Sequence, residues 1–291
     1  MEKTLFFVHV PKCAGMSLTN ALRRDLPADR LYQNTSMIEN FRTGRPDFLE
    51  IGELGKLRAV IGHWLHEAML PFLTAPLLFA TSIRHPVQRV RSQYRFDMAM
   101  RAQGWKPPSE EHFLNRNRNV ICAFLCQVFP SIRADHGSAL EAAKCILSGM
   151  DVVFDVPDAL EAQRRLMRAI GLADPSVQPE NASGDTGIEI GATNEDILPF
   201  VAEDMALYDW FTSRPPAPGG NPVHDPEVRA MFARLAERRR QPVFLAETLA
   251  LRLARELHVE APDGDAMELR LWRQRIFAAE LHKAFCKLRR E

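Results

Sequence analysis

Four short runs of almost entirely apolar residues, separated by polar or helical stretches, constrain the fold of this 291-residue chain more than any other feature. The runs cover residues 5–10, 58–61, 77–83 and 151–156. Strands that are apolar along their whole length are buried on both faces, and the stretches between these runs are long enough for crossover connections. The sequence therefore predicts an α/β fold with a parallel sheet flanked by helices.

Apolar residues with helical spacing follow the first predicted strand and recur along the chain. Leu18, Leu22 and Leu26 lie on one face of a helix predicted for residues 17–26. Further helices are predicted at residues 87–100, 110–128, 138–148, 157–170 and 194–212. We assign these elements to one domain, residues 1–214.

A segment rich in proline and glycine follows this domain. Apart from Ala217, residues 215–222 are all Pro, Gly or Asn, and we predict a linker over residues 215–225. Residues 226–291 are predicted to form a helical C-terminal extension. Its last helix is basic and amphipathic. It is interpreted either as a contact for a membrane or an acidic partner or, more simply, as the solvated face of a packed helix.

The charge balance and the cysteines limit the partners and the compartment. The chain has 37 Lys and Arg against 37 Asp and Glu, which gives no argument for bulk attraction to nucleic acid or to an anionic membrane. Five scattered cysteines do not form a disulfide framework, and Cys122 and Cys126 indicate core residues rather than a zinc site. No apolar window is long enough for a signal peptide or a transmembrane segment. We therefore predict a cytoplasmic protein without a metal.

The junction between the first predicted strand and helix predicts a phosphate site. It reads Val10-Pro11-Lys12-Cys13-Ala14-Gly15-Met16-Ser17-Leu18. A loop at a helix N-terminus presents backbone N–H groups to an anion, to which Lys12 adds a charge and Ser17 a hydroxyl, while Gly15 allows close approach. Because Lys12 precedes the glycine, the loop differs from the G-x-x-x-x-G-K-[ST] type that binds ATP or GTP with Mg²⁺.

A second set of polar residues begins where the third predicted strand ends. It reads Arg84-His85-Pro86-Val87-Gln88-Arg89-Val90-Arg91-Ser92-Gln93-Tyr94. Arg84 leaves the carboxyl edge of the strand, where open α/β sheets bind ligands, and Pro86 begins a helix. Arg84 and Ser92 are therefore expected to reach one anionic group. The other basic residues as far as Lys106 add a local positive field, although Arg91, Arg95 and Arg101 are equally well interpreted as a solvated helix face.

Together the two motifs resemble those of the sulfotransferases that use 3′-phosphoadenosine 5′-phosphosulfate (PAPS), particularly the branch that includes heparan sulfate 2-O-sulfotransferase and its bacterial relatives. The resemblance spans roughly residues 4–212 and implies a P-loop-NTPase-like sheet. In that family the first motif, usually P-K-T-A-G-T-S, holds the 5′-phosphosulfate, and the second, usually R-D-P-x-x-R-x-x-S-x-Y, holds the 3′-phosphate.

Carried over to this chain, the resemblance implies two sets of ligands for the nucleotide sulfate donor. The 3′-phosphate is bound by Arg84 and Ser92. The 5′ site is lined by Lys12, Cys13, Ala14, Gly15, Met16, Ser17 and Leu18. The chain departs from the family where Cys13 and Met16 replace threonines and where His85 replaces aspartate.

Sulfuryl transfer needs a base for the acceptor's proton and positive charge on the departing phosphate. Lys12 suits the second role. His63 ends the second predicted strand at the same edge as Lys12 and Arg84, and it is similar in position to the catalytic histidine of the 2-O-sulfotransferase branch. Its unperturbed pKa suits a general base. His66 is the alternative base, and His9 is better interpreted as a hydrogen-bonded core histidine.

Three functions remain open at this stage. The first is in-line transfer of a sulfuryl group from PAPS to the hydroxyl of a carbohydrate or small metabolite. The second is a P-loop-type phosphotransferase, which the missing Walker lysine disfavours. The third is a catalytically inactive nucleotide-binding module, suggested by Met16 and by the helical extension. Residues 26–53 carry no motif that identifies the acceptor, and the oligomeric state is not predicted.

Overall fold

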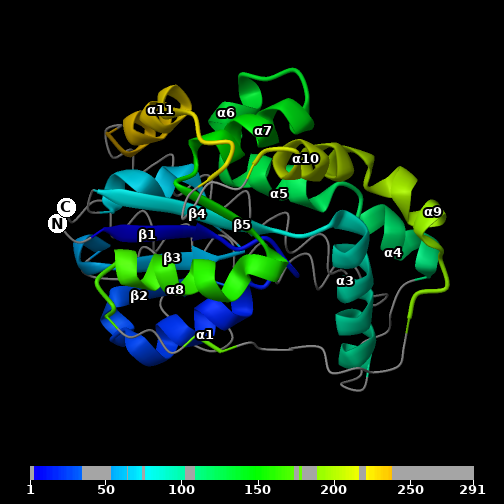
Figure 1. Ribbon diagram of the computed structural model, residues 1–291, viewed down its shortest axis with the longest axis horizontal. Coiled ribbons are helices and arrows are strands. Elements are labelled where there is room, and N and C mark those ends of the chain that lie inside the picture. Colours follow the sequence, from blue (N-terminus) through cyan, green and yellow to red (C-terminus); the bar gives the residue numbers. More distant parts are fainter. Residues whose placement is uncertain are drawn as a thin grey trace, which may run out of the picture.

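A computed structural model describes residues 3–34, 54–63, 65–73, 76–101, 109–173, 177–178, 189–215 and 221–237. Its centre is a five-stranded sheet in the order β2-β3-β1-β4-β5, in which every neighbouring pair is parallel (Figure 1). The strands are β1 Thr4–Val8, β2 Leu31–Asn34, β3 Ala59–Gly62, β4 Leu77–Ile83 and β5 Val152–Asp155. The predicted α/β fold with a parallel sheet is confirmed.

The sequence did not predict strand β2. Its residues Leu31 and Gln33 are half-buried while Tyr32 between them is buried, so the strand lacks the continuous apolar run of its neighbours. β2 is an edge strand that pairs only with β3, and two of its four residues, Gln33 and Asn34, are polar. The other edge strand, β5, has the apolar run Val152 to Phe154 and was predicted.

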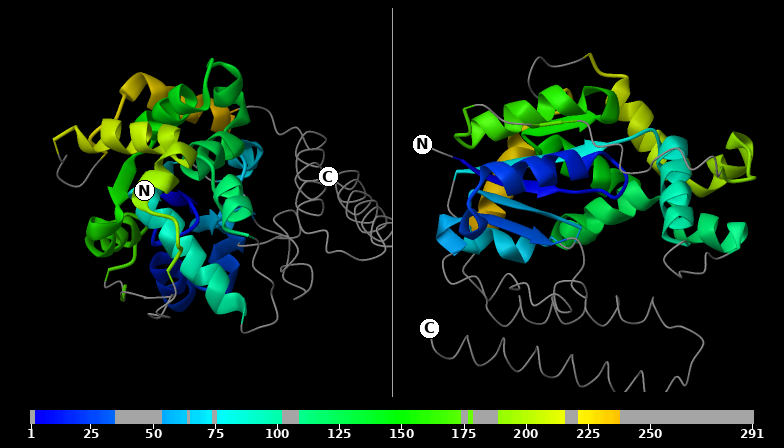
Figure 2. Two further views of the ribbon diagram at one scale, coloured as in Figure 1. Left: turned by 90° about the vertical axis from the view of Figure 1, so that its right-hand side faces the viewer. Right: turned by 90° about the horizontal axis from the view of Figure 1, so that it is seen from below.

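Helices cover both faces of the sheet (Figures 1 and 2). The α-helices are α1 Gly15–Asp25, α3 Pro86–Arg101, α4 Glu110–Arg116, α5 Val120–Val128, α6 Pro130–Ala134, α7 Ala139–Gly149, α8 Ala159–Ala169, α9 Asn194–Ile197, α10 Ala202–Thr212 and α11 Pro226–Glu237. Short 3₁₀ helices are η1 Ala28–Arg30, η3 Leu54–Lys56, η4 Glu67–Phe72, η5 Val156–Asp158 and η6 Leu198–Phe200. Phe7 packs with α1 and α8, whereas Phe6 packs with α5, α7 and α11 on the other face.

Two predicted helices are divided: residues 194–212 form α9, η6 and α10 rather than one helix, and residues 110–128 are divided by a pair of reciprocal caps. Residues 110–128 form α4 and α5, with Asn119 between them in a left-handed conformation at φ 44°. The Asn119 amide oxygen accepts hydrogen bonds from the backbone of Glu203 and Asp204, and the buried Asp204 carboxylate accepts from the first N–H groups of α5. The prediction of one continuous helix over residues 110–128 was wrong because a residue 83 positions away caps α5 internally.

The first helix of the predicted extension packs into the hydrophobic core. In α11, the ring of Phe232 lies 4.8 Å from that of Phe129 and 5.1 Å from that of Phe79. Residues 238–291 and 216–220 lie outside the described residues, so the division into a domain, a linker and an extension stays a prediction. None of the helices in the described part of the chain combines the length and apolar character needed to cross a membrane.

Register places the ends of three strands together. Val8 of β1 aligns with Gly62 of β3 and with Thr81 of β4. The segments that leave β1, β3 and β4 therefore emerge at one edge of the sheet, and they begin the loop to α1, the segment containing His63 and the segment containing Arg84. This is the carboxyl edge, where open parallel sheets bind ligands.

Candidate functional site

The loop between β1 and α1 has the backbone of an anion-binding site. Lys12 and Ala14 adopt left-handed conformations, with φ of 66° and 62°, which residues with a Cβ seldom do. Where left-handed residues alternate with a residue of negative φ, as Lys12 and Ala14 do with Cys13, successive backbone N–H groups point to one side of the loop. Within the described residues, α1 begins at Gly15 without a side-chain cap and without an acidic residue in its first turn. No side-chain cap and no acidic residue among the described residues therefore offsets the positive end of the α1 dipole.

The side chain of His9 leaves room only for glycine at position 15. A Cβ at Gly15 would lie 2.0 Å from Cδ2 and 2.2 Å from Nε2 of His9, whose ring fills that space. Sequence reasoning explained Gly15 by the approach of a ligand, whereas the structure shows that His9 already excludes any larger residue. His9 is buried, as expected for a core histidine, but its Nδ1 has no hydrogen-bond partner among the described residues.

Two side chains of the loop motif point into the protein. Cys13 belongs to the core on one face of the sheet and Leu18 to the core on the other. Burial raises the pKa of the Cys13 thiol to about 12, and the Cys13 N–H donates to the Val10 carbonyl at 3.2 Å. Met16 is half-buried and Ser17 is buried. The side chains of Cys13 and Leu18 therefore lie in the two cores beneath the loop.

Arg84 lies directly against the loop. Its Nη1 donates to the Lys12 carbonyl at 3.3 Å, while its Nε is buried without a partner among the described residues. Burial lowers the pKa of Arg84, although a guanidinium stays charged in proteins. Ser92 is buried on α3. A positively charged side chain with an N–H group that has no partner among the described residues is suited to bind an anion at this edge.

Lys12 lies close to Arg84 and rests on an aromatic ring. Its Nζ is 4.3 Å from the centre of the Phe96 ring. Burial lowers the pKa of Lys12, and the charge of Arg84 lowers it further. Two cations in this proximity favour an anionic ligand that would neutralise both.

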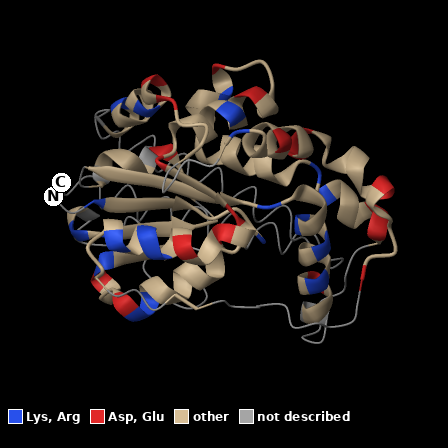
Figure 3. Cartoon of the chain, viewed as in Figure 1, with Lys and Arg blue, Asp and Glu red and all other residues tan. Residues whose placement is uncertain are grey.

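Three other basic residues of α3, a helix whose basic residues are blue in Figure 3, have partners within the protein. Arg89 is fully buried, and its Nη2 donates to the Asn117 side chain. Arg95 forms an ion pair of 2.6 Å with Glu189, and Arg91 lies 3.7 Å from the same carboxylate. The local positive field predicted for this segment is therefore partly neutralised, and Arg91 and Arg95 face Glu189. The Arg101 side chain lies outside the described residues.

His63 is held in the tautomer that a general base needs. Its Nδ1 is 2.7 Å from the carbonyl oxygen of His9, and a carbonyl only accepts hydrogen bonds. Nδ1 therefore carries the proton in the neutral ring, and Nε2 keeps a lone pair. Burial lowers the pKa of His63, which keeps the ring neutral at pH 7. The rings of His63 and His9 are 4.3 Å apart.

His66, the alternative base, is in a different environment. It is 3% exposed, whereas His63 is half-buried. Its carbonyl accepts the hydrogen bond that begins η4, from the N–H of Met69. The geometry therefore favours His63 over His66 for contact with a substrate.

Sequence reasoning missed several polar residues at this edge. Asp155 ends β5, and its carboxylate accepts a hydrogen bond from the Tyr208 hydroxyl of α10. The Tyr208 ring packs edge-on against His85 at 5.3 Å. Ser82 and Gln163 also contact the loop, as described below. Only Asp155 had a sequence signal, because it is the polar residue that ends an apolar strand.

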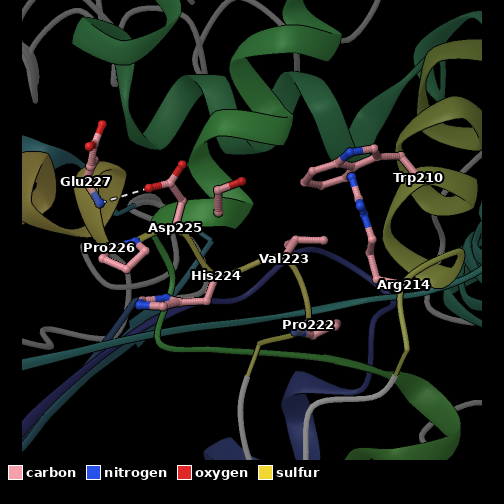
Figure 4. A pocket seen from close by; sticks show the side chains of 9 residues that line it. Trp210, Arg214, Pro222, Val223, His224, Asp225, Pro226 and Glu227 are labelled. Carbon is pink, nitrogen blue, oxygen red and sulfur yellow. Dashed lines mark hydrogen bonds between the residues drawn. The ribbon is translucent and has the colours of Figure 1, made fainter.

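A surface pocket of about 750 Å³ lies elsewhere, near the amino edge of the sheet (Figure 4). Trp210 of α10 and Arg214, which follows the end of that helix, line one side, and the turn into α11 lines the other. Ser148, which precedes β5, accepts a backbone hydrogen bond from Asp225 at its border. None of the predicted site residues lines this pocket.

Within the described residues, no group of three or more His, Cys, Asp or Glu side chains is placed to hold a metal ion. No protein-family model matches the chain, and no curated protein matches it. The class of protein that fold and site define is therefore an α/β protein with a polar, cationic site at the carboxyl edge of its sheet.

Proposed function

We propose that the protein is a sulfotransferase that moves a sulfuryl group from PAPS to a hydroxyl of a carbohydrate or small metabolite. One observation carries the proposal: within the described residues, a loop with left-handed residues before an uncapped helix, a cation with an unpaired buried donor and a histidine whose Nδ1 is the hydrogen-bonded nitrogen share one sheet edge. These are the three groups that sulfuryl transfer requires. The two motifs and their order add to this support, as does the parallel sheet flanked by helices, which is compatible with the P-loop-NTPase-like fold that the resemblance implies.

The residues present fit the donor nucleotide. The backbone N–H groups at the start of α1 and the Lys12 ammonium would hold the 5′-phosphosulfate, and Arg84 with Ser92 would hold the 3′-phosphate. The unpaired Nε of Arg84 and the uncapped α1 are the structural grounds for this assignment. Cys13 would contribute only through its backbone, because its side chain lies in the core.

The proposed reaction assigns one role to each of two side chains. His63 accepts the proton of the acceptor hydroxyl at Nε2 as the acceptor oxygen bonds to sulfur. The bond between sulfur and the phosphate oxygen breaks, and Lys12 stabilises the negative charge left on the departing phosphate. PAPS supplies the sulfuryl group, so the step needs no oxidant or reductant.

Ligand selectivity tests this proposal. Calorimetric titration should show binding of adenosine 3′,5′-bisphosphate, and weaker binding of AMP and of ATP with Mg²⁺. Preference for ATP would favour the phosphotransferase. Binding without turnover on a panel of carbohydrate and small-molecule acceptors would favour the inactive module. The few, scattered cysteines support a cytoplasmic location as part of the proposal.

A further inference from the structure

Three consecutive carbonyl groups of the loop each accept a hydrogen bond from a side chain elsewhere in the fold. Arg84 Nη1 donates to the Lys12 carbonyl and Ser82 Oγ of β4 to the Cys13 carbonyl. Gln163 Nε2 of α8 donates to the Ala14 carbonyl at 2.8 Å, across 149 positions of sequence. The loop is thus held from three sides.

These bonds decide where the N–H groups point. In a trans peptide the carbonyl and the next N–H point in opposite directions. Ser82 therefore turns the Ala14 N–H away from β4, and Gln163 turns the Gly15 N–H away from α8. The left-handed conformations of Lys12 and Ala14 are unfavourable on their own and persist only where surrounding contacts hold them.

Gln163 has no evident purely structural purpose. Its side chain is fully buried on the face of α8 that packs with α1, and its Oε1 has no partner among the described residues. A buried amide with an unsatisfied oxygen is unfavourable for stability. The bond to Ala14 is the contact that accounts for a glutamine at this position.

We infer that Ser82 and Gln163 are positioning residues that hold the phosphate loop in its anion-binding conformation before a ligand arrives. The inference rests on the proposed function only for the identity of the ligand, because the clamp would serve any phosphate group bound by the loop. It adds to the site two residues that neither sequence motif assigned as ligands.

The test compares two clamp variants with two matched controls. Ser82→Ala and Gln163→Met each remove one donor to the loop. Thr81→Val removes the neighbouring hydroxyl of β4, which donates to the Val8 carbonyl at 2.8 Å, and Asn221→Leu removes a buried amide that donates to Leu147 and Met150. The controls thus remove buried side-chain donors that do not touch the loop.

Dissociation constants for adenosine 3′,5′-bisphosphate, ATP and pyrophosphate, measured by calorimetry, would be set against thermal unfolding midpoints. We expect each clamp variant to bind about 3- to 10-fold more weakly, from the usual net contribution of a hydrogen bond. The controls should bind as the wild type does, even though their midpoints fall by a similar amount. Ser82→Thr, which keeps the hydroxyl, should restore binding.

Clamp variants that bind as tightly as Thr81→Val would overturn the inference. If one clamp variant does not fold, the other decides, because the two donors come from different elements. A wild-type protein that prefers ATP would overturn the sulfotransferase proposal alone, since the clamp would still be tested with ATP. A wild-type protein that binds none of the three ligands would overturn both.

Discussion

The two edges of the sheet differ in how completely their polar groups are paired: the amino edge holds a half-buried, paired Arg–Asp cluster, and the carboxyl edge holds buried atoms without partners in the described part of the chain. At the amino edge, Arg229 pairs with Asp151 at 2.8 Å and donates to the Leu77 carbonyl, and Asp151 also accepts from the Phe79 N–H. At the carboxyl edge, Arg84 Nε and His9 Nδ1 are buried without partners among the described residues. Buried polar groups are normally satisfied, so an edge that leaves them unpaired indicates a place for a ligand.

Replacing His63 should give the largest effect at the carboxyl edge. A general base contributes about 10²- to 10⁴-fold, so His63→Ala should lose that much turnover while it still binds nucleotide. The wild-type activity should be full above the pKa of His63 and fall as the pH drops through it. Because burial lowers this pKa, the acidic limb should lie below the ordinary value of 6.5. A pH–rate profile measures both the loss of turnover in the variant and the position of the acidic limb in the wild type.

His66→Ala is the matched control, because it removes a nearby imidazole that is buried. It should keep the acidic limb and most of the activity. An acidic limb that survives in His63→Ala and disappears in His66→Ala would identify His66 as the base.

Replacing Lys12 should follow in size and should act on the reaction step. Charge on the departing phosphate develops only in the transition state, so Lys12→Ala should lower kcat by more than it raises the KM for PAPS. Loss of one such electrostatic contact typically costs about 10²- to 10³-fold in kcat. Steady-state kinetics decide the point, and a variant with normal kcat and only a raised KM would make Lys12 a simple anchor.

Replacing Arg84 should weaken binding selectively. Arg84→Ala should bind adenosine 3′,5′-bisphosphate roughly 10- to 100-fold more weakly, because hydrogen bonds to charged groups contribute the most. AMP, which lacks the 3′-phosphate, should be affected much less. Arg91→Ala is the control, since Arg91 already faces Glu189 and donates to Asn194 at 2.9 Å. Equal weakening of both ligands by Arg84→Ala would contradict the 3′ assignment.

The smallest effect on function should come from the amino edge. Arg229→Ala should leave nucleotide binding unchanged but lower the free energy of unfolding by about 1 to 3 kcal/mol, because it leaves Asp151 and the Leu77 carbonyl without a charged donor. Urea unfolding and calorimetry on one sample measure the two quantities. Loss of binding in this variant would remove the distinction between the two edges.

Elements whose burial is uniform could be predicted from sequence, and elements shaped by distant contacts could not. The four apolar runs all became strands: β1, β3 and β4 are buried along their whole length and must be apolar throughout, and the edge strand β5 is apolar because its two central residues are buried. The edge strand β2 lacked that signal. The break between α4 and α5 depends on Asp204, which local periodicity cannot reveal.

The sequence by itself determined the α/β pattern and the residues that end its strands. Motif spacing therefore singled out Lys12, His63 and Arg84, since a residue after a parallel strand reaches the carboxyl edge whatever the detailed packing. Only the tertiary structure decided how these groups are held. The tautomer of His63 is set by the carbonyl of His9, 54 positions away, and the loop is clamped by Gln163, 149 positions away. Hydrogen bonds across such distances depend on how the helices and strands pack, which no local pattern of residues records.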